Sequence, residues 1–595
     1  MVRFLPNFYF FFGIGTWASP TPDATDCTGV NAISMKCASA EVPYKRDFFY
    51  VGGHSVKAAS GNITVDQVYV EKLTPATRVT QKNPLVFFHG GGLAGSTWLN
   101  TPDGREGWAS YFVKKGYVIY LVDNNAVGRS SENAISSYPM SSGSASETVM
   151  KFFTSPENYD TYPQAKLHTQ WPGTGADGDP VYDQFKKSLI PLTTNFVGQE
   201  NALRKAGCEM LSMLGEKAFL VSHSLGSRNP LLLSNDCPEY IAGSINLEAA
   251  TSPFWSYAEG LGGFAGSPWG LTNTPVTYDP PVSDPSELEH ESVGNETLAH
   301  RNCYLQVEPA RTLPQINKVP YLLLTGEASV HVTYDHCVID FLKQAGGKPE
   351  WIKLADWYIK GNGHFLHVEK NNLQIAGLVH AWIQVKASEQ DLPAIARIAT
   401  SAFHPSTDAL SRRLFPPHLQ PKDIPNGEAA YDWRAARKAS SLASSESHLV
   451  VAVDDDKDPE NRIVGFALWD APPADGDDSG PSKPIECEAL DKEAFEEMKK
   501  TVNQDAVDTF GEKGIAGVWH LDYIGVAPGN QRRGIGKMLL QWGLDKASEE
   551  RKDCYLVATE AGRPLYVAAG FEDLRTVSIL DIPHYSMIMR ARKSG

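Results

Sequence analysis

The stretch Ala218-Phe219-Leu220-Val221-Ser222-His223-Ser224-Leu225-Gly226 decides the fold of the first half of the chain. Its apolar run predicts a buried strand, and the small residues after it predict a sharp turn into a helix. A serine on such a strand-to-helix turn is held where its hydroxyl can act as a nucleophile. We therefore take Ser224 as the candidate nucleophile, with Ser222 standing where a glycine is usual.

The segments around this stretch predict an α/β sheet protein. Short apolar runs alternate with amphipathic stretches from about residue 62 to residue 383. Strands are expected at Leu85–Phe88, Val118–Val122, Ala218–Val221, Ala242–Leu247 and Tyr321–Leu324. Helices are expected at Trp108–Lys115, Gln199–Leu214, Asp335–Ala345 and Asn372–Ile383. The polar segment 131–195 does not show this alternation of apolar runs and amphipathic stretches, and we expect it to form a cap inserted over a site.

A second strand-to-turn segment offers the groups that stabilise an oxyanion. His89-Gly90-Gly91-Gly92-Leu93 directly follows the apolar run 85–88. Glycines let backbone N–H groups converge on one carbonyl oxygen. We therefore expect the amides of Gly91 and Leu225 to form an oxyanion hole.

The general base of such a site is expected to be a histidine late in the chain. His364 follows Gly361-Asn362-Gly363 on a turn before the last helix of this half, and His367 is the less favoured competitor. His331 and His336 come earlier, and we expect them to cover a loop or a helix surface.

The acid that orients this histidine has three candidates. Its usual place is the loop after the run 321–324, where Glu327 stands and Ser329 replaces the expected aspartate. The neighbouring run ends in Glu248, and because adjacent strands lie about 4.8 Å apart, its long side chain can reach the same imidazole. Glu248 is preferred, Glu327 is the alternative and Asp335 is the third choice.

Together these motifs resemble an esterase lineage of the α/β-hydrolase family. The segments that carry the resemblance are 89–93, 101–105 with 107–108, 128–130, 222–226 and 361–364 with 371–372. It covers about residues 45–386 and implies a cofactor-free hydrolase of small-molecule carboxylic esters, whose triad glutamate follows the sixth strand. This supports Glu248. By this likeness Ser224 attacks the ester carbonyl, His364 transfers the proton and Glu248 stabilises the imidazolium.

A second series of predicted helices and strands begins near residue 384, with almost no linker between it and the first series. We expect helices near 391–399 and 492–502 and strands at 448–453 and 463–469. Leu521 to Val526 predicts a further strand, which leads into Gln531-Arg532-Arg533-Gly534-Ile535-Gly536 and then into a helix over 537–544. A glycine-bearing loop that opens a helix presents amide N–H groups and the positive end of the helix dipole to an anion such as a pyrophosphate.

This second pattern resembles the coenzyme-binding motif of the GNAT acetyltransferases, and Pro564 to Phe571 resembles the closing helix and strand of that fold. The resemblance covers about residues 384–591 and implies a smaller α+β N-acetyltransferase fold that binds acetyl-CoA. It implies that Tyr566 protonates the leaving thiolate. The residues that it assigns to the cofactor are Ile524, Val526, Gln531, Arg532, Arg533, Gly534, Ile535 and Gly536. The base for the unknown amine acceptor stays open between Asp522 and Glu486, and ordinary structural roles fit both.

The composition excludes a general nucleic-acid binder. The chain has 595 residues and a formal charge of −16, whereas phosphate neutralisation requires clustered Lys and Arg. No long apolar span follows the N-terminus, so we expect no stable membrane span. We expect no metal site, and the oligomeric state stays open.

Several features of the first part of the chain suggest secretion. Arg3, a short apolar stretch and small residues near Ala18 predict a signal peptide over residues 1–18. N-glycosylation sequons begin at Asn62 and Asn295. An even set of cysteines compatible with disulfides lies in this part, namely Cys27, Cys37, Cys208, Cys237, Cys303 and Cys337. Cys487 and Cys554, in the second part, are expected to be free thiols.

These observations predict two domains, residues 19–383 and 384–595, that form a fused serine esterase and N-acetyltransferase. The secretory features conflict with the cytosolic supply of acetyl-CoA. Two alternatives therefore stay open. One is a secreted esterase with an inert or binding-only second module, and the other is two neighbouring proteins joined by a faulty gene model at the junction 383–386.

Overall fold

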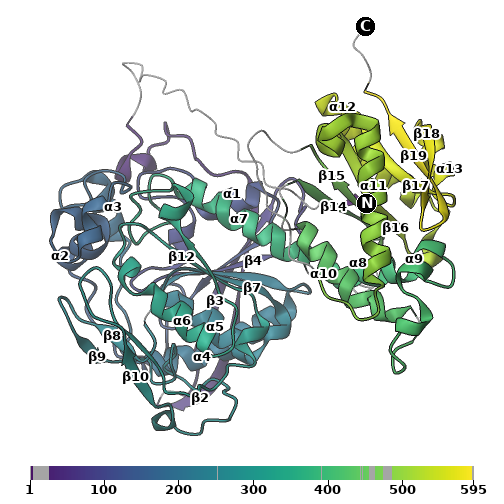
Figure 1. Ribbon diagram of the computed structural model, residues 1–595. Coiled ribbons are helices and arrows are strands. Elements are labelled where there is room, and N and C mark those ends of the chain that lie inside the picture. The colour runs from purple at the N-terminus through teal and green to yellow at the C-terminus, as the bar shows by residue number, and fades with distance from the viewer. Residues whose placement is uncertain are drawn as a thin grey trace. The chain divides into compact units, whose positions relative to one another are not determined.

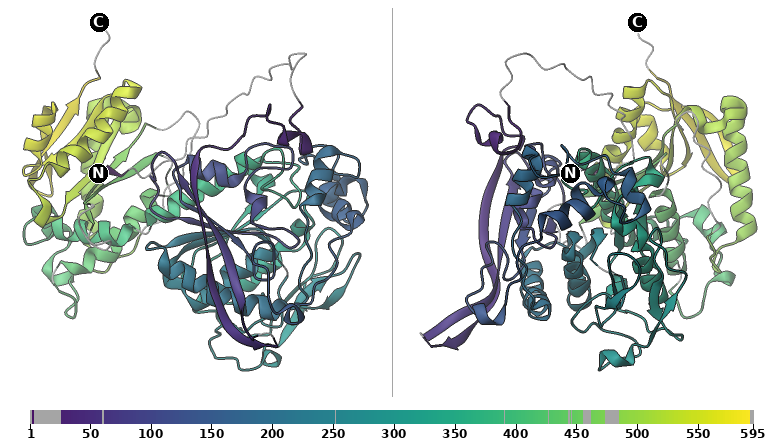
Figure 2. Two further views of the ribbon diagram at one scale, coloured as in Figure 1. Left: turned by 180° about the vertical axis from the view of Figure 1, so that it is seen from behind. Right: turned by 90° about the vertical axis from the view of Figure 1, so that its left-hand side faces the viewer.

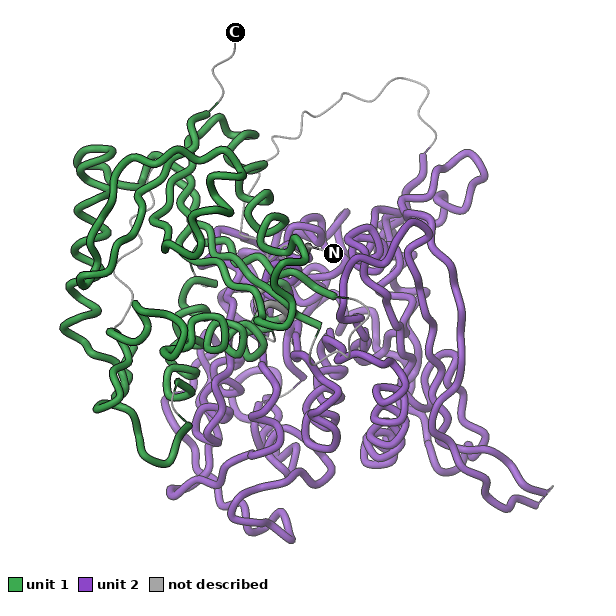
Figure 3. The backbone as a smooth tube through the Cα atoms, turned by 90° about the vertical axis from the view of Figure 1, so that its right-hand side faces the viewer, with its two compact units in different colours: residues 1–15, 384–595 green, residues 16–383 purple. Residues whose placement is uncertain are grey.

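The computed structural model describes residues 2–3, 26–59, 61–250, 252–389, 391–425, 427–442, 444, 446–454, 462–472 and 485–591. The chain divides into two compact units, residues 16–383 and residues 1–15 with 384–595, which Figure 3 colours separately. Apart from Val2–Arg3, which form the strand β1, the segment predicted as a signal peptide lies outside the described residues.

The larger unit is built on an eight-stranded sheet with the order β13-β12-β7-β6-β4-β5-β3-β2 (Figure 1). The strands from β13 to β5 pair in parallel, and β3 and β2 extend the sheet as a long antiparallel hairpin (Figure 2). The bounds are β2 Tyr44–Ala58, β3 Gly61–Pro75, β4 Leu85–Phe88, β5 Ile119–Asp123, β6 Ala218–Ser224, β7 Ile241–Ala249, β12 Tyr321–Thr325 and β13 Glu350–Lys353.

Helices cover both faces of this sheet because successive strand residues point to opposite sides. Phe219 packs on Trp382 of one helix layer, whereas Leu220 packs with Leu203 of the other. The first layer holds α1 Trp108–Lys114 and α7 Asn372–Glu389. The second holds α4 Phe196–Met213, α5 Arg228–Asp236 and α6 Asp335–Gln344. The expected α/β fold is confirmed, and α7 runs six residues beyond its predicted end at Ile383.

The segment 131–195 contains short helices and turns instead of strands. Its helices are α2 Ser146–Val149, a π-helical turn Met150–Thr154 and α3 Pro180–Lys187. Val149, Trp171 and Phe185 of this segment form an apolar cluster with Phe365 and Val368. The segment therefore packs directly on the loop that carries His364.

The second unit is a seven-stranded sheet with the order β1-β14-β15-β16-β17-β19-β18. Its later strands are β14 Ser447–Val453, β15 Ile463–Asp470, β16 Trp519–Val526, β17 Cys554–Thr559, β18 Glu572–Ile579 and β19 Ile582–Met589. Its helices are α8 Leu392–Ala402, α9 Ala409–Leu414, α10 Tyr431–Leu442, α11 Lys492–Phe510, α12 Ile535–Glu550 and α13 Arg563–Ala569. Leu539 of α12 and Ile395 of α8 belong to separate cores on the two faces of the sheet. The smaller α+β fold expected for this half is confirmed.

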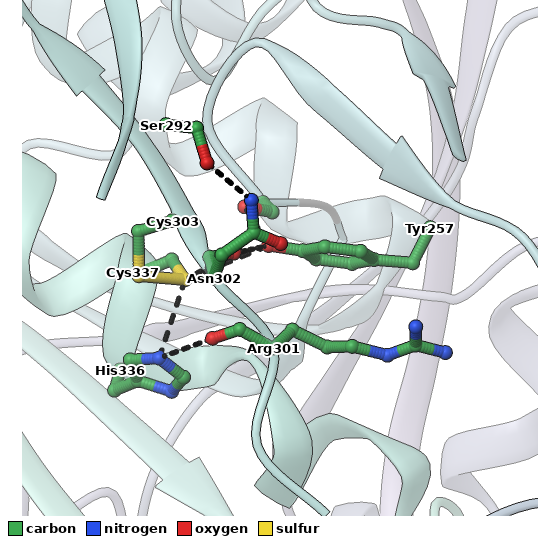
Figure 4. The surroundings of a disulfide bond; sticks show 8 residues. Tyr257, Ser292, Arg301, Asn302, Cys303, His336 and Cys337 are labelled. Carbon is green, nitrogen blue, oxygen red and sulfur yellow. Dashed lines mark hydrogen bonds between the residues drawn. A yellow bond between two sulfur atoms is a disulfide. The ribbon is translucent and has the colours of Figure 1, made fainter. Parts of the chain in front are cut away.

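Disulfides cross-link the larger unit. The six cysteines named above form the bonds Cys27–Cys37, Cys208–Cys237 and Cys303–Cys337, and Cys487 and Cys554 are free. Figure 4 shows the bond between Cys303 of β11 (Cys303–Gln306) and Cys337 of α6, beside which the His336 ring faces the carbonyl oxygen of Arg301 at 3.0 Å. Small hairpin strands near it are β8 Trp255–Tyr257, β9 Gly263–Ala265 and β10 His290–Val293. Within the described residues, none of the helices combines the length and the apolar character needed to cross a bilayer.

Candidate active sites

Ser224 ends β6 in the strained backbone conformation of a nucleophile elbow. Its φ is +49°, a value that non-glycine residues rarely adopt. Gly226 permits the turn, because a Cβ there would lie only 2.4 Å from the carbonyl oxygen of His89. Ser222 is fully buried and donates its hydroxyl to Oδ1 of Asn246 at 2.8 Å, so β7 accommodates the serine that replaces the usual glycine.

The glycine loop after β4 lies against this elbow. A Cβ at Gly91 would meet Cδ1 of Leu225 at 2.4 Å, and one at Gly90 would meet Nδ1 of His223 at 2.5 Å. Leu225 opens the short 3-10 turn Leu225–Ser227, and the first N–H groups of a helix have no acceptor within it. The two segments expected to supply oxyanion donors are therefore brought together.

His364 and Glu248 meet in the interior near the end of β6, where the His364 ring lies 4.6 Å from the ring of His223, the residue before Ser224. Glu248 follows Leu247 near the end of β7 and is fully buried, with its Oε2 3.7 Å from Nδ1 of His364. The same carboxylate accepts the N–H of Gly326 at 2.6 Å and the hydroxyl of Ser329. Nδ1 of His364 has no hydrogen-bond partner among the described residues, and this carboxylate lies just beyond hydrogen-bond distance from it.

The imidazole of His364 is held between two rings. Phe153 stacks on one face at 4.6 Å between centroids, and His331 stacks on the other at 4.8 Å. Burial lowers the pKa of His364 well below its ordinary value, and the nearby His331 and His367 lower it further. Burial also raises the pKa of Glu248, and Asp335 adds to this effect. Both shifts favour the uncharged forms of the two groups.

The loop 360–371 that carries His364 is anchored from two sides. Arg105 donates to the backbone carbonyl oxygens of Val368 at 2.8 Å and Glu369 at 3.2 Å. The buried Glu369 carboxylate accepts the N–H of Gly363 at 2.9 Å, and it faces Nε2 of His168 at 3.2 Å. These contacts fix the backbone on which the candidate base stands.

The other acid candidates have different partners. Glu327 accepts the N–H of Gly361 at 2.8 Å, and Asp335 accepts the hydroxyl of Thr325 at 2.6 Å. His367, the competing base, pairs with the Thr97 hydroxyl at 2.8 Å, and its ring packs at a tilt against Trp98. Among these candidates, Glu248 is the acid that the structure places beside His364. The side chains of Glu327, Asp335 and His367 make other contacts.

One expectation was wrong. His331 does not cover a surface: it is 4% exposed and its Nδ1 lies 3.2 Å from Oδ1 of Asp335. The 3-10 turn Val330–Thr333 directs it inward, onto the face of His364. Chain order alone could not reveal this, because the stacking depends on two loops that are distant in sequence. Phe153, from the segment 131–195, was missed for the same reason.

Within the part of the chain that the structure describes, two clusters contain side chains of the kinds that bind metals. Glu248, His331 and His364 offer ligand atoms within 4.8 Å of one another. Cys303, His336 and Cys337 form the other cluster, but both sulfurs are committed to a disulfide. The first cluster coincides with the candidate acid and base, so its atoms have a use without a metal.

A pocket opens beside the elbow and the glycine loop. It is partly open to solvent, and the empty space within and directly outside its walls is about 440 Å³. Its lining comes from both segments, from the neighbouring loops and from the two helices behind them: His89, Gly90, Gly91, Asn124, Val127, Leu192, Phe196, Gln199, Glu200, Leu225, Arg228 and Asn229. The pocket therefore leads to the proposed oxyanion donors.

In the second unit, β16 and β17 separate after a short contact. They pair in parallel only at Trp519–Cys554 and His520–Tyr555, while β16 runs on to Val526 and β17 to Thr559. On its other edge, β16 pairs with β15, where Ile524 lies opposite Ala467 and Val526 opposite Gly465. Ile524 and Val526 thus lie on the part of β16 beyond its pairing with β17.

The predicted pyrophosphate loop leads from β16 into α12. Gly534 caps the helix with φ of +82°, and Arg532 also has a positive φ of 65°. Gln531 donates to the carbonyl oxygen of Val526 at 3.3 Å, and Arg533 reaches Asp454 at 3.2 Å. Ile535 and Gly536 form the first turn of α12, so the backbone N–H groups of this turn begin a helix of sixteen residues.

The remaining predicted residues of this unit differ in environment. Tyr566 is buried on α13, where burial raises the pKa of its hydroxyl. Burial alone would raise the pKa of Asp522, but together the nearby charges, those of Arg437 and Lys438 foremost, outweigh burial, and the pKa is lowered. Glu486 is a surface residue that pairs with Lys492 at 2.5 Å. The structure brings neither carboxylate to Tyr566.

Comparisons with known proteins give matches for both halves of the chain. The Acetyltransferase (GNAT) family model matches residues 409–571. The chain is 37% identical over 338 residues to a probable secreted lipase, phiG, of a fungal species (strain ATCC 74256), covering 57% of this chain and 89% of that protein. It is 45% identical over 49 residues to a probable acyltransferase, SID5, of Ajellomyces capsulatus, covering 8% of this chain and only 36% of that relative.

A solved structure described as a novel bacterial esterase covers 58% of this chain and 98% of its own, with 21% identity and a TM-score of 0.39. The long match to the lipase comes from the half that contains the serine elbow, and the GNAT match comes from the half that contains the glycine loop. The chain therefore belongs to the family of this probable secreted lipase, and its second half carries a domain that matches the GNAT family model.

Proposed function

We propose that the larger unit hydrolyses carboxylic esters with a Ser224-His364-Glu248 triad. Ser224 attacks the ester carbonyl, and His364 takes the hydroxyl proton and returns it to the leaving alcohol. Glu248 holds the proton on Nδ1 and stabilises the imidazolium. The N–H groups of Gly91 and Leu225 receive the developing oxyanion. Water then releases the acyl group by the same route.

The observation that carries this proposal is the approach of Glu248 to Nδ1 of His364 at 3.7 Å, at the end of the strand next to the elbow. This separation exceeds a hydrogen bond, but catalytic hydrogen bonds commonly shorten only when substrate binds. Membership in a lipase family supports the same chemistry.

Hydrolysis of p-nitrophenyl esters by the full chain tests the triad. Ser224→Ala should lower kcat by a factor of about 10³ or more, whereas the neighbouring Ser222→Ala keeps the nucleophile and should retain most of the activity. Unchanged turnover in Ser224→Ala would refute the triad.

We further propose that the second unit binds acetyl-CoA and transfers its acetyl group to an amine. The separation of β16 from β17 and the positive φ of Gly534 support a site for the pantetheine arm and the pyrophosphate. Ile524 and Val526 would pair with the arm through their backbones. Residues 531–536 would hold the pyrophosphate, and Tyr566 would protonate the thiolate. No step of this transfer involves the triad.

Calorimetric titration of acetyl-CoA into the full-length Ser224→Ala variant tests the cofactor, because this background prevents thioester cleavage by the triad. Saturable binding without acetylation of any tested amine would favour the binding-only module. The absence of saturable binding would refute the cofactor assignment.

We also propose that residues 1–18 direct the protein into the secretory route. The disulfides and the secreted lipase relative support this proposal. Detection of one full-length polypeptide in the culture medium would establish both the route and the fusion. Two separate cellular products would support the joined-gene alternative.

A further inference from the structure

The pocket beside the proposed oxyanion hole contains a largely buried arginine. Arg228 begins α5 one helical turn after Ser224 and lines the pocket together with Gly91 and Leu225. Its side chain is 11% exposed. A guanidinium is charged at every pH at which the protein is folded, so the pocket wall contains a fixed positive charge, with the carboxylate of Glu200 in the same wall.

The hydrogen bonding of this guanidinium is incomplete. Nη2 donates to the Ser267 hydroxyl across a long 3.4 Å, and Nε is buried without any partner among the described residues. Nη1 lies 4.0 Å from Oε1 of Glu200, which is too far for a hydrogen bond. Burial lowers the pKa of Arg228, and the charge of Glu200 offsets this only in part.

Glu200 does not form a hydrogen bond with Arg228, because its carboxylate accepts hydrogen bonds from the loop that contains Asn273 and Thr274. Oε1 accepts the side-chain amide of Asn273 at 2.7 Å. Oε2 accepts both the N–H and the hydroxyl of Thr274 at 2.8 Å. Turning Glu200 toward Arg228 would break these bonds and leave the buried groups of the 273–274 loop unpaired.

A buried cation with an unused donor favours an anion supplied from outside the protein. Desolvation makes such a charge costly, and a carboxylate that pairs with a guanidinium recovers this cost through short, charge-assisted bonds. The side chains of Val127, Leu192 and Phe196 make part of the remaining wall apolar. This combination fits a short hydrocarbon chain that ends in a carboxylate.

We propose that Arg228 binds a free carboxylate in the acyl part of the substrate, so that the enzyme prefers half-esters of dicarboxylic acids. The acyl carbonyl oxygen occupies the Gly91 and Leu225 end of the pocket, and the acyl chain extends along the apolar wall toward the guanidinium. This inference rests on the hydrolase proposed above.

The test compares two p-nitrophenyl esters of equal chain length, mono-p-nitrophenyl suberate and p-nitrophenyl octanoate, on the full chain. The ratio of their kcat/KM values should fall about 10- to 100-fold in Arg228→Met, which is the range expected for one charged hydrogen-bonded contact. Arg228→Lys should give an intermediate ratio. Lys205→Met removes one positive charge from an exposed position on α4 and should leave the ratio unchanged.

An unchanged ratio in Arg228→Met would overturn the proposal, and wild-type enzyme that cleaves neither ester would instead count against the hydrolase. If Arg228→Met fails to fold, competition on the wild-type enzyme decides the question. Free suberate should inhibit octanoate-ester hydrolysis at a concentration at least about tenfold lower than free octanoate does. Equal inhibition by the two acids would overturn the proposal.

Discussion

The hydroxyl of Ser329 donates to Oε2 of Glu248, the same oxygen that lies 3.7 Å from Nδ1 of His364. Ser329 stands on the loop after β12, where the acid of the triad is usually found, and Glu248 reaches the same place from β7. The two positions therefore converge on one point beside the imidazole.

This convergence predicts that the acid can be moved between the two positions. Glu248→Gln should lower kcat by about 10³-fold or more, because a neutral amide does not stabilise the imidazolium. Adding Ser329→Asp should recover at least about tenfold, since the new carboxylate lies next to the same ring. Adding Ser329→Asn, which is equal in size but uncharged, should recover nothing, and equal recovery by both variants would contradict the electrostatic role of Glu248.

His168 is expected to make stability depend on pH. It is buried between Glu157 and Glu369; burial opposes protonation, but the hydrogen bonds to the two carboxylates raise the pKa of His168 to about 9. A folded pKa above the unfolded value of about 6.5 stabilises the fold fully below pH 6.5, and this stabilisation is lost as the pH rises through 9. It amounts to about 3 kcal/mol at most.

Thermal unfolding of the wild type and of His168→Gln at pH 6 and pH 9.5 measures this contribution. The wild type should have the higher Tm at pH 6, and the difference between the two proteins should shrink at pH 9.5. His290, a more exposed histidine of the same unit, provides the control variant His290→Gln. A difference that is constant with pH would show that the His168 charge is not what stabilises the loop.

Gly226 should tolerate no side chain, because a Cβ there would lie 2.4 Å from a backbone oxygen of His89 that cannot move without distorting β4. Gly226→Ala should therefore destabilise the larger unit by about 1–3 kcal/mol and lower esterase activity. Gly377→Ala, whose Cβ would meet only the Tyr111 hydroxyl at 3.7 Å within α7, is the matched control. Denaturant unfolding should separate the two variants, and equal stability would contradict the close approach.

Gly534 and Gly529 provide a comparison for the GNAT domain. A Cβ would meet nothing within 4 Å at either position, but only Gly534 has a positive φ, of 82°. Gly534→Ala must adopt a left-handed conformation that costs about 1–2 kcal/mol, so the loop should shift and acetyl-CoA should bind roughly tenfold more weakly. Gly529→Ala should bind as the wild type does. Calorimetric titration measures both affinities, and equal losses would argue against the loop geometry.

Local sequence patterns were sufficient for most of the fold. The strands at 85–88, 218–221 and 321–324 were predicted within three residues of their observed bounds, because uninterrupted apolar runs between turn residues have few alternatives. The end of α7 was missed because no glycine or proline lies between Ile383 and Pro393 to stop the helix sooner. The inward position of His331 was missed because its turn carries no local signal of direction.

The sequence by itself determined the two folds, the serine elbow and the glycine loop, since each depends on residues that are neighbours in the chain. Tertiary structure alone decided which carboxylate meets His364, because Glu248 and Glu327 lie on adjacent strand ends and differ only in the partners that folding gives them. The incomplete hydrogen bonding of the Arg228 guanidinium was likewise invisible in the sequence. Its pairing depends on Glu200 being held by the 273–274 loop, and only packing brings these segments together.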